Sequence, residues 1–335
     1  MKNVLVVITN RASYPRAKSL IAALDCHVAL MDPELDIEME LGERVVSRIQ
    51  SRFYGGLRSM VATAGHLMED IGSLIESVDP RAVICVGDRH EVLAVAAAAR
   101  MMNRPVVHLL AGERSGSVDD SIRFAVSALA DLLLAPHLHA QKELLSRGYK
   151  NVRITGCPSI DLCDAELPDI SGLSGYGHGA EIDGPFYLAC LHPDTTITAF
   201  DNVSAMLRLC DRMKPYSVVW VRPTQHDAYG REMDKVLLQH AQDGWQLVRH
   251  IPHNLMLSVI DKCIAMIGNS SMMYREAAYM GVPCVAIGHR QHGRVVTQNI
   301  VADLPKERGR VTSDPIWVSG GGKAAAREIC ERYMV

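Results

Sequence analysis

Carboxylates gather just after two short apolar runs that have the composition of buried strands. Asp88 comes shortly after Val83–Val86, and Glu113 and Asp119 come after Val106–Leu109. An Ala-rich helix is expected between the runs, so the two following loops should meet at the carboxyl edge of a parallel sheet. Carboxylates at such an edge can exchange protons with a substrate, or they can cap helices by accepting from backbone N–H groups. Because two successive strand ends carry them, we favour a reactive site.

A histidine and an arginine occupy comparable positions elsewhere in the chain. His192 follows the strand-like run Phe186–Leu191 and precedes a proline, and Arg11 follows the first apolar run. Histidine is well suited to proton transfer near neutral pH, although a lone histidine is often structural. Arg11 could bind a phosphate group from across a cleft, because guanidinium pairs well with phosphate oxygens. The backbone amides of Gly320–Gly322 could do the same, unless this run is only a flexible turn.

A second group of residues has the composition of a phosphate and ribose site. Ser270 and Ser271 end a short apolar run and open an expected helix over Met272–Met280. Free N–H groups and the helix dipole favour an anion there, although an ordinary Ser-rich cap would look the same. Arg290, on the loop after the next apolar run, adds a guanidinium for phosphate oxygens. Glu276, within the helix, could accept from a ribose diol or could simply face solvent.

Composition excludes several classes of protein. The chain has 335 residues, 48% of them hydrophobic, and a formal charge of −3, which argues against a general nucleic-acid coat. No run approaches the ~20 apolar residues of a membrane span, and the start resembles a first strand more than a signal peptide. Nine cysteines lie without a CxxC or a His/Cys cluster. We therefore expect reduced, mostly buried thiols in a cytoplasmic protein, and no metal site.

Strand-like and helix-like runs alternate in both halves of the chain, which predicts an α/β fold. The length favours two domains, each a doubly wound, Rossmann-like sheet, facing one another across a cleft. Residues 164–184 are rich in Gly, Asp, Ser and Pro and are expected to be a linker. The predicted boundaries are therefore 1–163 for the first domain and 185–335 for the second, with a closing helix after the glycine run. The acidic stretch 32–40 is expected to be a loop, and 43–77 to be helical with an interruption near Gly55-Gly56.

Several motifs in this order resemble the UDP-N-acetylglucosamine 2-epimerases, and most closely their hydrolysing branch. The resemblance covers nearly the whole chain. It rests on TNRASY (9–14), GDR (87–89), HLLAGERSGSVDDSIR (108–123), GCPSID (156–161), HPDTT (192–196) and IGNSSMMYREAAYMGVPCVAIGHRQHGR (267–294). It implies the glycosyltransferase-B architecture, two Rossmann-like domains with the nucleotide in the cleft between them. It also implies a reaction in which a base removes the proton at sugar C2, UDP leaves from C1, and water adds to the resulting glycal.

The resemblance assigns roles to particular positions of this sequence. It implies catalytic roles for Asp88, Asp119 and His192. It implies UDP-binding roles, on the second domain for the most part, for a larger set: Arg11, Asp227, Ser270, Ser271, Glu276 and Arg290. A UDP-sugar would be the substrate, and no cofactor is expected beyond it.

Two positions depart from the family pattern. Close hydrolysing members carry a catalytic Glu two residues after the His that corresponds to His108, and here that position is Leu110, which should make the cleft wall apolar. Glu113 or Asp120 would then take over the role. Thr224 stands where a nucleotide-contacting Asn is usual.

Two alternatives to the epimerase remain open at this stage. A transferase on the same scaffold would pass the sugar to a glycan or to a modified base in viral DNA, helped by local positive charge at Arg290, His292 and Arg294. Such a transferase needs one base to activate its acceptor, which Asp88 or Asp119 could provide. A nucleotide-sugar sensor with degenerate catalysis is the third hypothesis. A homo-oligomer is compatible with all three.

Overall fold

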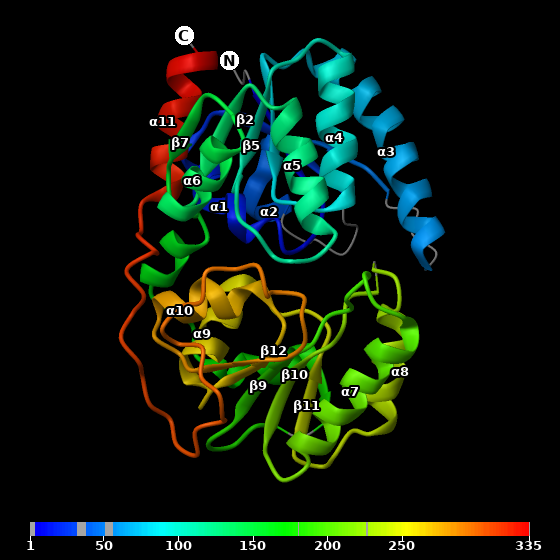
Figure 1. Ribbon diagram of the computed structural model, residues 1–335, viewed down its shortest axis with the longest axis vertical. Coiled ribbons are helices and arrows are strands. Elements are labelled where there is room, and N and C mark those ends of the chain that lie inside the picture. Colours follow the sequence, from blue (N-terminus) through cyan, green and yellow to red (C-terminus); the bar gives the residue numbers. More distant parts are fainter. Residues whose placement is uncertain (1–3, 32–37, 51–55, 180, 226, 335) are drawn as a thin grey trace.

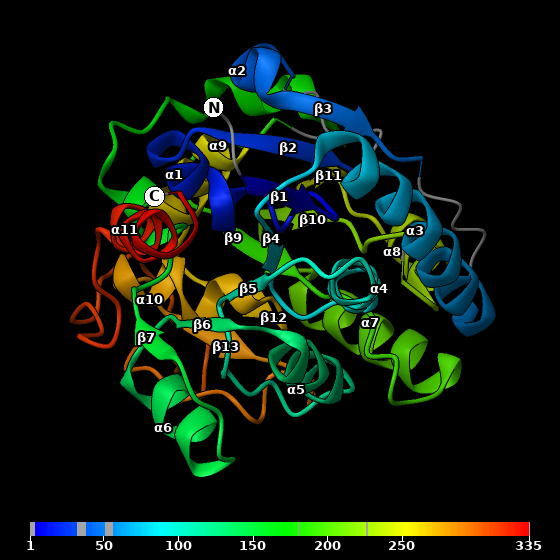
Figure 2. The same ribbon diagram turned by 90° about the horizontal axis from the view of Figure 1, so that it is seen from above.

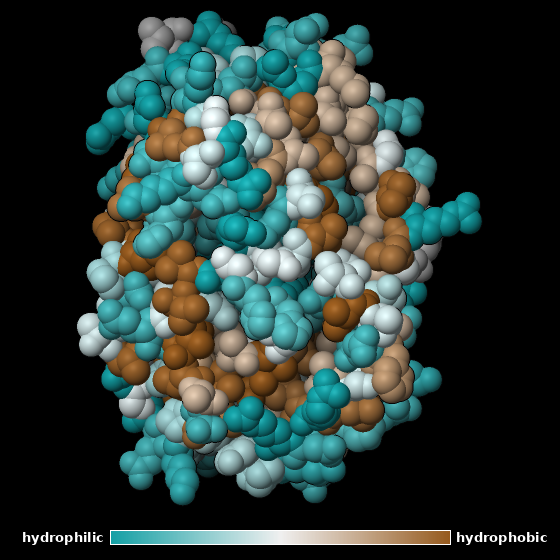
Figure 3. All heavy atoms as spheres, in the orientation of Figure 1, coloured by the Kyte–Doolittle hydropathy of each residue, from teal (hydrophilic) through white to brown (hydrophobic). Residues whose placement is uncertain are grey.

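The computed structural model describes residues 4–31, 38–50, 56–179, 181–225 and 227–334, and consists of two α/β domains stacked on one another (Figure 1). Each domain has its own sheet. The expected α/β architecture with two doubly wound domains is confirmed. Hydrophilic side chains cover much of the junction between the domains on the face shown in Figure 3, and apolar ones gather on the second domain below it.

The first sheet has seven strands in the order β3-β2-β1-β4-β5-β6-β7, and all neighbouring pairs are parallel. Successive side chains of a strand point to opposite faces, so Val4, Val6 and Ile8 belong to one core and Leu5 and Val7 to another. Helices cover both faces, which is why these strands are continuous apolar runs. The strands are β1 (Val4–Ile8), β2 (Cys26–Leu30), β3 (Val45–Arg48), β4 (Ala82–Val86), β5 (Val106–Leu109), β6 (Leu132–Ala135) and β7 (Val152–Ile154).

The second sheet has the order β13-β12-β9-β10-β11-β8 and is parallel except for its edge strand β8. Its strands are β8 (Gly177–Gly179), β9 (Tyr187–Cys190), β10 (Val218–Val221), β11 (Trp245–Val248), β12 (Met266–Gly268) and β13 (Cys284–Ala286). The helices of the chain are α1 (Pro15–Ala23), α2 (Glu38–Leu41), α3 (Gly56–Val78), α4 (His90–Met101), α5 (Asp119–Leu129), α6 (Leu138–Ser146), α7 (Ala199–Met213), α8 (Gly230–Gln239), α9 (His253–Lys262), α10 (Glu276–Tyr279) and α11 (Gly321–Tyr333).

The predicted helix over 43–77 is wrong in its first part. Val45–Arg48 forms the edge strand β3 instead, paired in parallel with β2, and α3 begins only at Gly56. Two adjacent β-branched residues, Val45 and Val46, fit a half-buried strand better than a helix. Of the acidic stretch expected as a loop, residues 32–37 lie outside the described residues, and Glu38–Leu41 forms the short helix α2.

The predicted linker belongs largely to the second domain. Gly177–Gly179 pairs antiparallel with β11, and Leu173 is buried in the second domain's core. Glycine is required at the edge because a Cβ on Gly179 would lie 2.2 Å from the carbonyl oxygen of Trp245. The glycines of this stretch therefore belong to a short edge strand whose backbone lies close to that of β11.

The closing helix packs on the first domain, although the predicted boundary placed it in the second. Ala325, Ala326 and Ile329 of α11 share a core with β1 and α1, and Figure 2 shows α11 beside α1. Gly322 permits this approach, because a Cβ there would lie 2.6 Å from the backbone of Ser19. The chain thus crosses back to its first domain after completing the second.

All nine cysteines are free thiols, and seven of them are buried, as the sequence predicts. In the described part of the chain no helix is long and apolar enough to cross a membrane. Among these same residues, no group of three or more His, Cys, Asp and Glu side chains is placed to hold a metal ion.

Candidate active site

Strand order brings the predicted residues to the junction between the domains. In the first sheet the order reverses between β1 and β4, and in the second between β9 and β12. Loops that leave the carboxyl ends of strands at such a switch point diverge and create a binding crevice. Arg11 follows β1, Asp88 follows β4, His192 follows β9 and Ser270 follows β12. The two switch points supply four of the ten predicted site residues.

Asp88 is held as an anion by a buried arginine. Arg123 of α5 is 1% exposed and donates from Nη2 to the Asp88 carboxylate. Its Nη1 donates to Asp120 Oδ1 at 2.6 Å and to the Glu113 carbonyl at 2.5 Å. Burial alone would raise the pKa of Asp88, but Arg123 and then Arg16 hold it below its usual range. Asp88 is therefore ionised at neutral pH.

Asp120 holds the loop in shape through its hydrogen bonds, whereas its neighbour Asp119 takes no part in them. Its carboxylate accepts from Ser115 N at 2.6 Å, Ser115 Oγ at 2.9 Å and Gly116 N at 2.9 Å. Asp120 therefore satisfies backbone N–H groups of the loop before α5 and does not cap the helix. The Asp119 carboxylate makes no hydrogen bond with the described residues, and burial followed by the negative charge of Asp88 raises its pKa. Asp119 is the carboxyl group best placed to exchange a proton.

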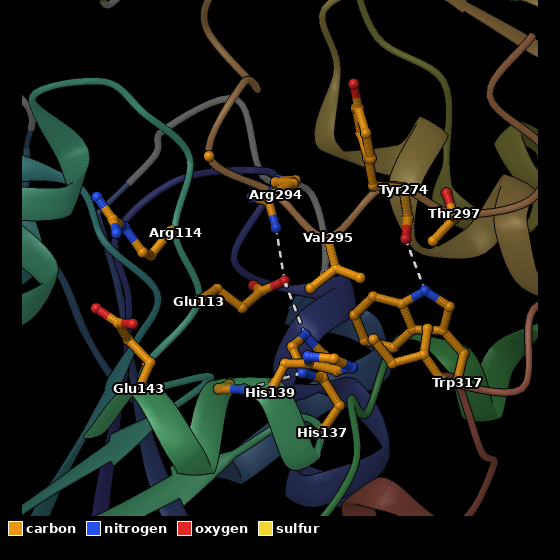
Figure 4. Close-up of a pocket in the computed structure, with 14 residues that line it drawn as sticks. Glu113, Arg114, His137, His139, Glu143, Tyr274, Arg294, Val295, Thr297 and Trp317 are labelled. Carbon is orange, nitrogen blue, oxygen red and sulfur yellow. Dashed lines mark hydrogen bonds and ion pairs between the residues drawn. The ribbon is translucent and has the colours of Figure 1, made fainter. Parts of the chain in front are cut away.

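Glu113 connects the two domains. It is 5% exposed, and it accepts from Arg275 Nη2 at 2.6 Å and from Arg294 Nη1 at 2.5 Å, with His137 Nε2 at 3.9 Å. Figure 4 shows the carboxylate pointing toward Arg294, beside a cavity of about 190 Å³ between the domains. Burial would raise the pKa of Glu113, but Arg275 and Arg294 hold it well below its usual range. Because Arg294 is buried in this contact, it adds no charge to a surface patch for nucleic acid.

His192 is anchored through its backbone and keeps one ring nitrogen available. Its N–H donates to Asn269 Oδ1 and its carbonyl accepts from Asn269 Nδ2, both at 2.8 Å. Nε2 lies 3.2 Å from Cys190 Sγ, and Nδ1 is buried without a partner among the described residues. Burial, followed by the charge of Arg290, lowers the pKa of His192 to about 3. The imidazole is therefore neutral at physiological pH and can donate or accept one hydrogen bond to a ligand.

A second ion pair crosses the junction near His192. Arg89 donates to the Glu91 carboxylate at 3.0 and 3.1 Å, and its Nη2 lies 2.7 Å from Asp227 Oδ1 on the loop after β10. Burial would raise the pKa of Asp227, but Arg89 lowers it to about 2. Arg290 donates to the Asn269 carbonyl at 3.2 Å and acts electrostatically on Asp119, Asp227 and His192.

The serine pair lies where two further arginines converge. Ser271 Oγ accepts from Arg16 Nη2 at 3.0 Å and from Arg275 Nη1 at 3.1 Å, and Ser270 caps a short 3-10 helix by accepting from Met272 N at 3.4 Å. Sequence reasoning missed Arg16. The signal was available, because Arg16 is the second residue of the helix that follows the first strand-end loop. Its guanidinium comes from the opposite domain and is well placed to hold an anion.

Glu276 is buried, which excludes the solvent-facing alternative. The predicted helix over Met272–Met280 is wrong as a continuous element, because it breaks at Arg275, whose φ of −121° and ψ of −87° are not helical. Glu276 is therefore the first residue of α10 rather than one further inside a helix. It is 3% exposed, and its Oε2 has no partner among the described residues. A buried carboxylate oxygen without a donor is costly, and ligand hydroxyl groups would satisfy it.

The glycine run at 320–322 and Leu110 differ from expectation, and Arg11 makes a contact across the junction. The amides of Gly320–Gly322 donate to the Asp161 carboxylate at 2.7–2.8 Å, so a protein side chain occupies this anion site. Leu110 is 1% exposed in the first domain's core, so the expected apolar cleft wall is wrong; its φ of +64° turns the side chain inward. Arg11 donates to the Arg249 carbonyl at 3.4 Å across the junction.

Comparison with known proteins decides the family. Residues 32–312 match the family model of UDP-N-acetylglucosamine 2-epimerase. The chain belongs to this family. The expectation of an epimerase-family enzyme is thereby confirmed.

Curated relatives and solved structures agree with this assignment. The chain is 26% identical over 90% of its length to a UDP-N-acetylglucosamine 2-epimerase of Neisseria meningitidis, covering 83% of that protein. It is 30% identical over 68% of its length to a GDP/UDP-N,N'-diacetylbacillosamine 2-epimerase (hydrolyzing) of Campylobacter jejuni, of which it spans 61%. A Methanocaldococcus jannaschii UDP-GlcNAc 2-epimerase in complex with UDP-GlcNAc and UDP has the same fold, with a TM-score of 0.75 at 14% identity over 99% of this chain and 100% of that one.

Proposed function

We propose that this protein is a hydrolysing UDP-N-acetylhexosamine 2-epimerase that releases UDP and a free 2-epimeric amino sugar. One observation carries the proposal: Asp119, a carboxyl group of raised pKa, lies within electrostatic range of Arg290 of the second domain, and Arg290 also acts on His192. Proton exchange requires a carboxyl group such as Asp119, and departure of a diphosphate requires donors such as His192 and Arg290. The family match and the hydrolysing relative support the same reaction.

The nucleotide would be held mainly by the second domain. Ser270, Ser271 and Arg290 offer hydroxyl and guanidinium donors to the diphosphate, and Arg16 approaches the same place from the first domain. Glu276 would accept from the ribose hydroxyls through its unpartnered oxygen. Because the diphosphate leaves as an anion, these donors stabilise the charge that develops in the transition state.

Proton transfer falls to the first domain. Asp119, ionised, accepts the C2 proton; the C2–H electrons form the C1=C2 bond of the glycal, and the C1–O bond breaks with its electron pair going to UDP. Water then adds across the C1=C2 bond: its oxygen bonds to C1, a proton from water is delivered to C2 on the opposite face, and Asp119 returns the proton it removed to solvent. Asp88, kept ionised by Arg123, does not compete for the proton and keeps the pKa of Asp119 raised. His192, neutral, donates a hydrogen bond to the departing diphosphate.

Glu113 has a different part in this proposal. Its two arginines hold it ionised, so it is a weak base, and it acts by positioning Arg275, which also contacts Ser271. In this proposal neither Glu113 nor Asp120 takes over the role of the Glu that is missing at Leu110: Asp119 is the base, and water supplies the new C2 proton.

The experiment is incubation of UDP-GlcNAc with the purified protein and no acceptor, followed by mass spectrometry and NMR of the products. We expect equimolar UDP and N-acetylmannosamine. Asp119→Asn should release neither, and Glu331→Gln, at an exposed position of α11, should behave as wild type. Intact UDP-GlcNAc that is consumed only when a glycan or DNA acceptor is added would instead support the transferase.

A further inference from the structure

A cavity of about 270 Å³ lies within the second domain, beside the proposed reaction site and apart from the junction cavity of Figure 4. His192 and Arg290 line its inner end, and the proposed function places both at the departing diphosphate, which is attached to C1 of the sugar next to the acylamino carbon C2. Its outer end reaches the exposed residues Asp201, Arg208 and His289. The cavity is therefore a short passage that leads from the reaction site between α7 and the loop after β13 to the surface.

The wall between these ends is apolar. Leu191, Ile197, Ala205, Met233 and Ile287 line it, and Leu191 and Met233 are buried in the second domain's core. An apolar cavity of roughly 150 Å³ suffices to hold benzene, and water in such a place lacks hydrogen-bond partners. An apolar group of several carbon atoms would fit this larger cavity.

The polar residues on the wall already satisfy one another. Asn202 accepts from Asp194 N at 2.8 Å and donates to the Asp194 carbonyl at 2.9 Å, while Asp194 Oδ1 accepts from the N–H and hydroxyl of Thr196. Asn269 exchanges both its hydrogen bonds with the backbone of His192. The amide groups of Asn202 and Asn269 therefore have little capacity left for a polar ligand, and the apolar part of the wall favours an apolar one.

We propose that this passage binds an acyl substituent of the sugar, and that it accepts amide-linked acyl groups longer than acetyl. The proposal rests on the proposed function for the place of the sugar, because His192 and Arg290 belong both to the reaction site and to the passage. The acyl carbonyl lies at the inner end and the alkyl part lies along Ile197, Ala205 and Met233. The outer opening leaves room for additional length.

The test is a ladder of UDP-glucosamines that carry N-acetyl, N-propanoyl, N-butanoyl or N-hexanoyl groups. Affinities are measured by calorimetry on the full chain with Asp119→Asn, so that no donor is consumed. We expect affinity to rise about threefold to fourfold for each added methylene up to butanoyl, from the ~0.8 kcal/mol that burial of one CH₂ contributes. The affinity for UDP alone is the reference.

Two variants of the wall and one control decide where the acyl group binds. Ala205→Leu, which fills the passage, should remove the gain for butanoyl by at least tenfold and leave UDP binding within twofold. Ile197→Ala, which widens it, should extend the gain to hexanoyl. Ser204→Leu, on the same helix but not on the wall, should match the parent.

The outcomes separate the two proposals. A flat or falling ladder, or equal effects of Ala205→Leu on the acetyl and butanoyl donors, would overturn the acyl passage. If the ladder holds while wild type releases no N-acetylmannosamine, the passage stands and the epimerase reaction fails. If N-acetylmannosamine is released and the ladder is flat, the reaction stands and the passage fails.

Discussion

Glu113, on the loop after β5, and Asp119, six residues later at the start of α5, have opposite electrostatics. Glu113 accepts from two arginines of the other domain, and its pKa is held well below the ordinary range. Asp119 has no hydrogen-bond partner among the described residues, sits near Asp88, and has a raised pKa. A carboxylate whose oxygens are saturated by guanidinium groups holds structure together, whereas one left unpaired beside a like charge is poised to exchange a proton. The comparison therefore assigns a structural role to Glu113 and a proton-exchange role to Asp119, which the sequence motif alone could not distinguish.

The largest expected effect is on turnover, from Asp119→Asn. The amide is nearly isosteric but cannot accept the C2 proton, so we expect a loss of 10²-fold to 10⁴-fold, as is typical of lost acid/base groups. Stability at neutral pH should not fall, because an acid with a raised pKa in the folded state destabilises the protein once it is ionised. Steady-state kinetics and thermal melting check both statements. Turnover within threefold of wild type would remove Asp119 from the reaction.

Glu113→Gln should act mainly on stability. Breaking a buried ion pair by removing one partner costs about 3–5 kcal/mol, and here two arginines lose their counter-ion. Denaturant unfolding measures this cost. Glu143→Gln is the matched control, since it removes only a half-exposed pair with Arg147 and should cost less than about 1 kcal/mol.

The pH dependence of the same variant sharpens the comparison. The pKa of Glu113 is depressed in the folded state, so its contribution to stability is present above the unfolded value and is lost as pH falls through the folded one. The acid-induced loss of stability should therefore be shallower in Glu113→Gln than in wild type. Its kcat/KM profile should keep the acid limb of wild type, because that limb belongs to Asp119. Disappearance of the limb would make Glu113 the base.

Arg290→Ala should weaken UDP binding by about 1.5–3 kcal/mol, because a charge-assisted contact to the diphosphate is lost. The same change removes a positive charge that lowers the pKa of Asp119. The acid limb of kcat/KM should therefore move to higher pH. Calorimetry with UDP and a pH–rate profile give the two readings, and wild-type values in both would refute the placement of Arg290.

The smallest effect expected is on the shape of the pH profile in His192 variants. Because the pKa of His192 is lowered to about 3, the imidazole stays neutral and contributes no limb near neutral pH. His192→Asn places an amide donor near the position of Nδ1 and should retain more turnover than His192→Gln, with the profile unchanged in both. A neutral-pH limb that vanishes in both variants would show that His192 titrates in the reaction.

Sequence patterns predicted the sheets well because buried parallel strands are continuous apolar runs; β5 begins and ends where expected. The patterns failed where contacts between distant parts of the chain determine the structure. Nothing in the glycine run at 320–322 shows that Asp161 would cap it, or that Gly322 lets α11 pack on the first domain. The break at Arg275 is likewise invisible in the sequence, as is the ion pair of Arg275 with Glu113 of the other domain.

The sequence indicated individual residues of the candidate site but not which of them contact one another. Asp88, Asp119 and His192 could be found because each follows a strand. The hydrogen bonds of Asp120 within the loop and the domain contact of Glu113 involve Arg123, Arg275 and Arg294, which come from three different parts of the chain. The position of Arg16 at the start of the helix after the first strand-end loop was a signal, but its contact with Ser271 of the second domain could not be read from the sequence.

The central claim is that Asp119 exchanges the proton at sugar C2, and the most direct measurement is turnover of UDP-GlcNAc in deuterated water without an acceptor. The account predicts deuterium at C2 of the released N-acetylmannosamine with wild type and with Glu113→Gln, and no exchange with Asp119→Asn. Undiminished exchange in Asp119→Asn, or product that retains its original C2 proton in wild type, would contradict it.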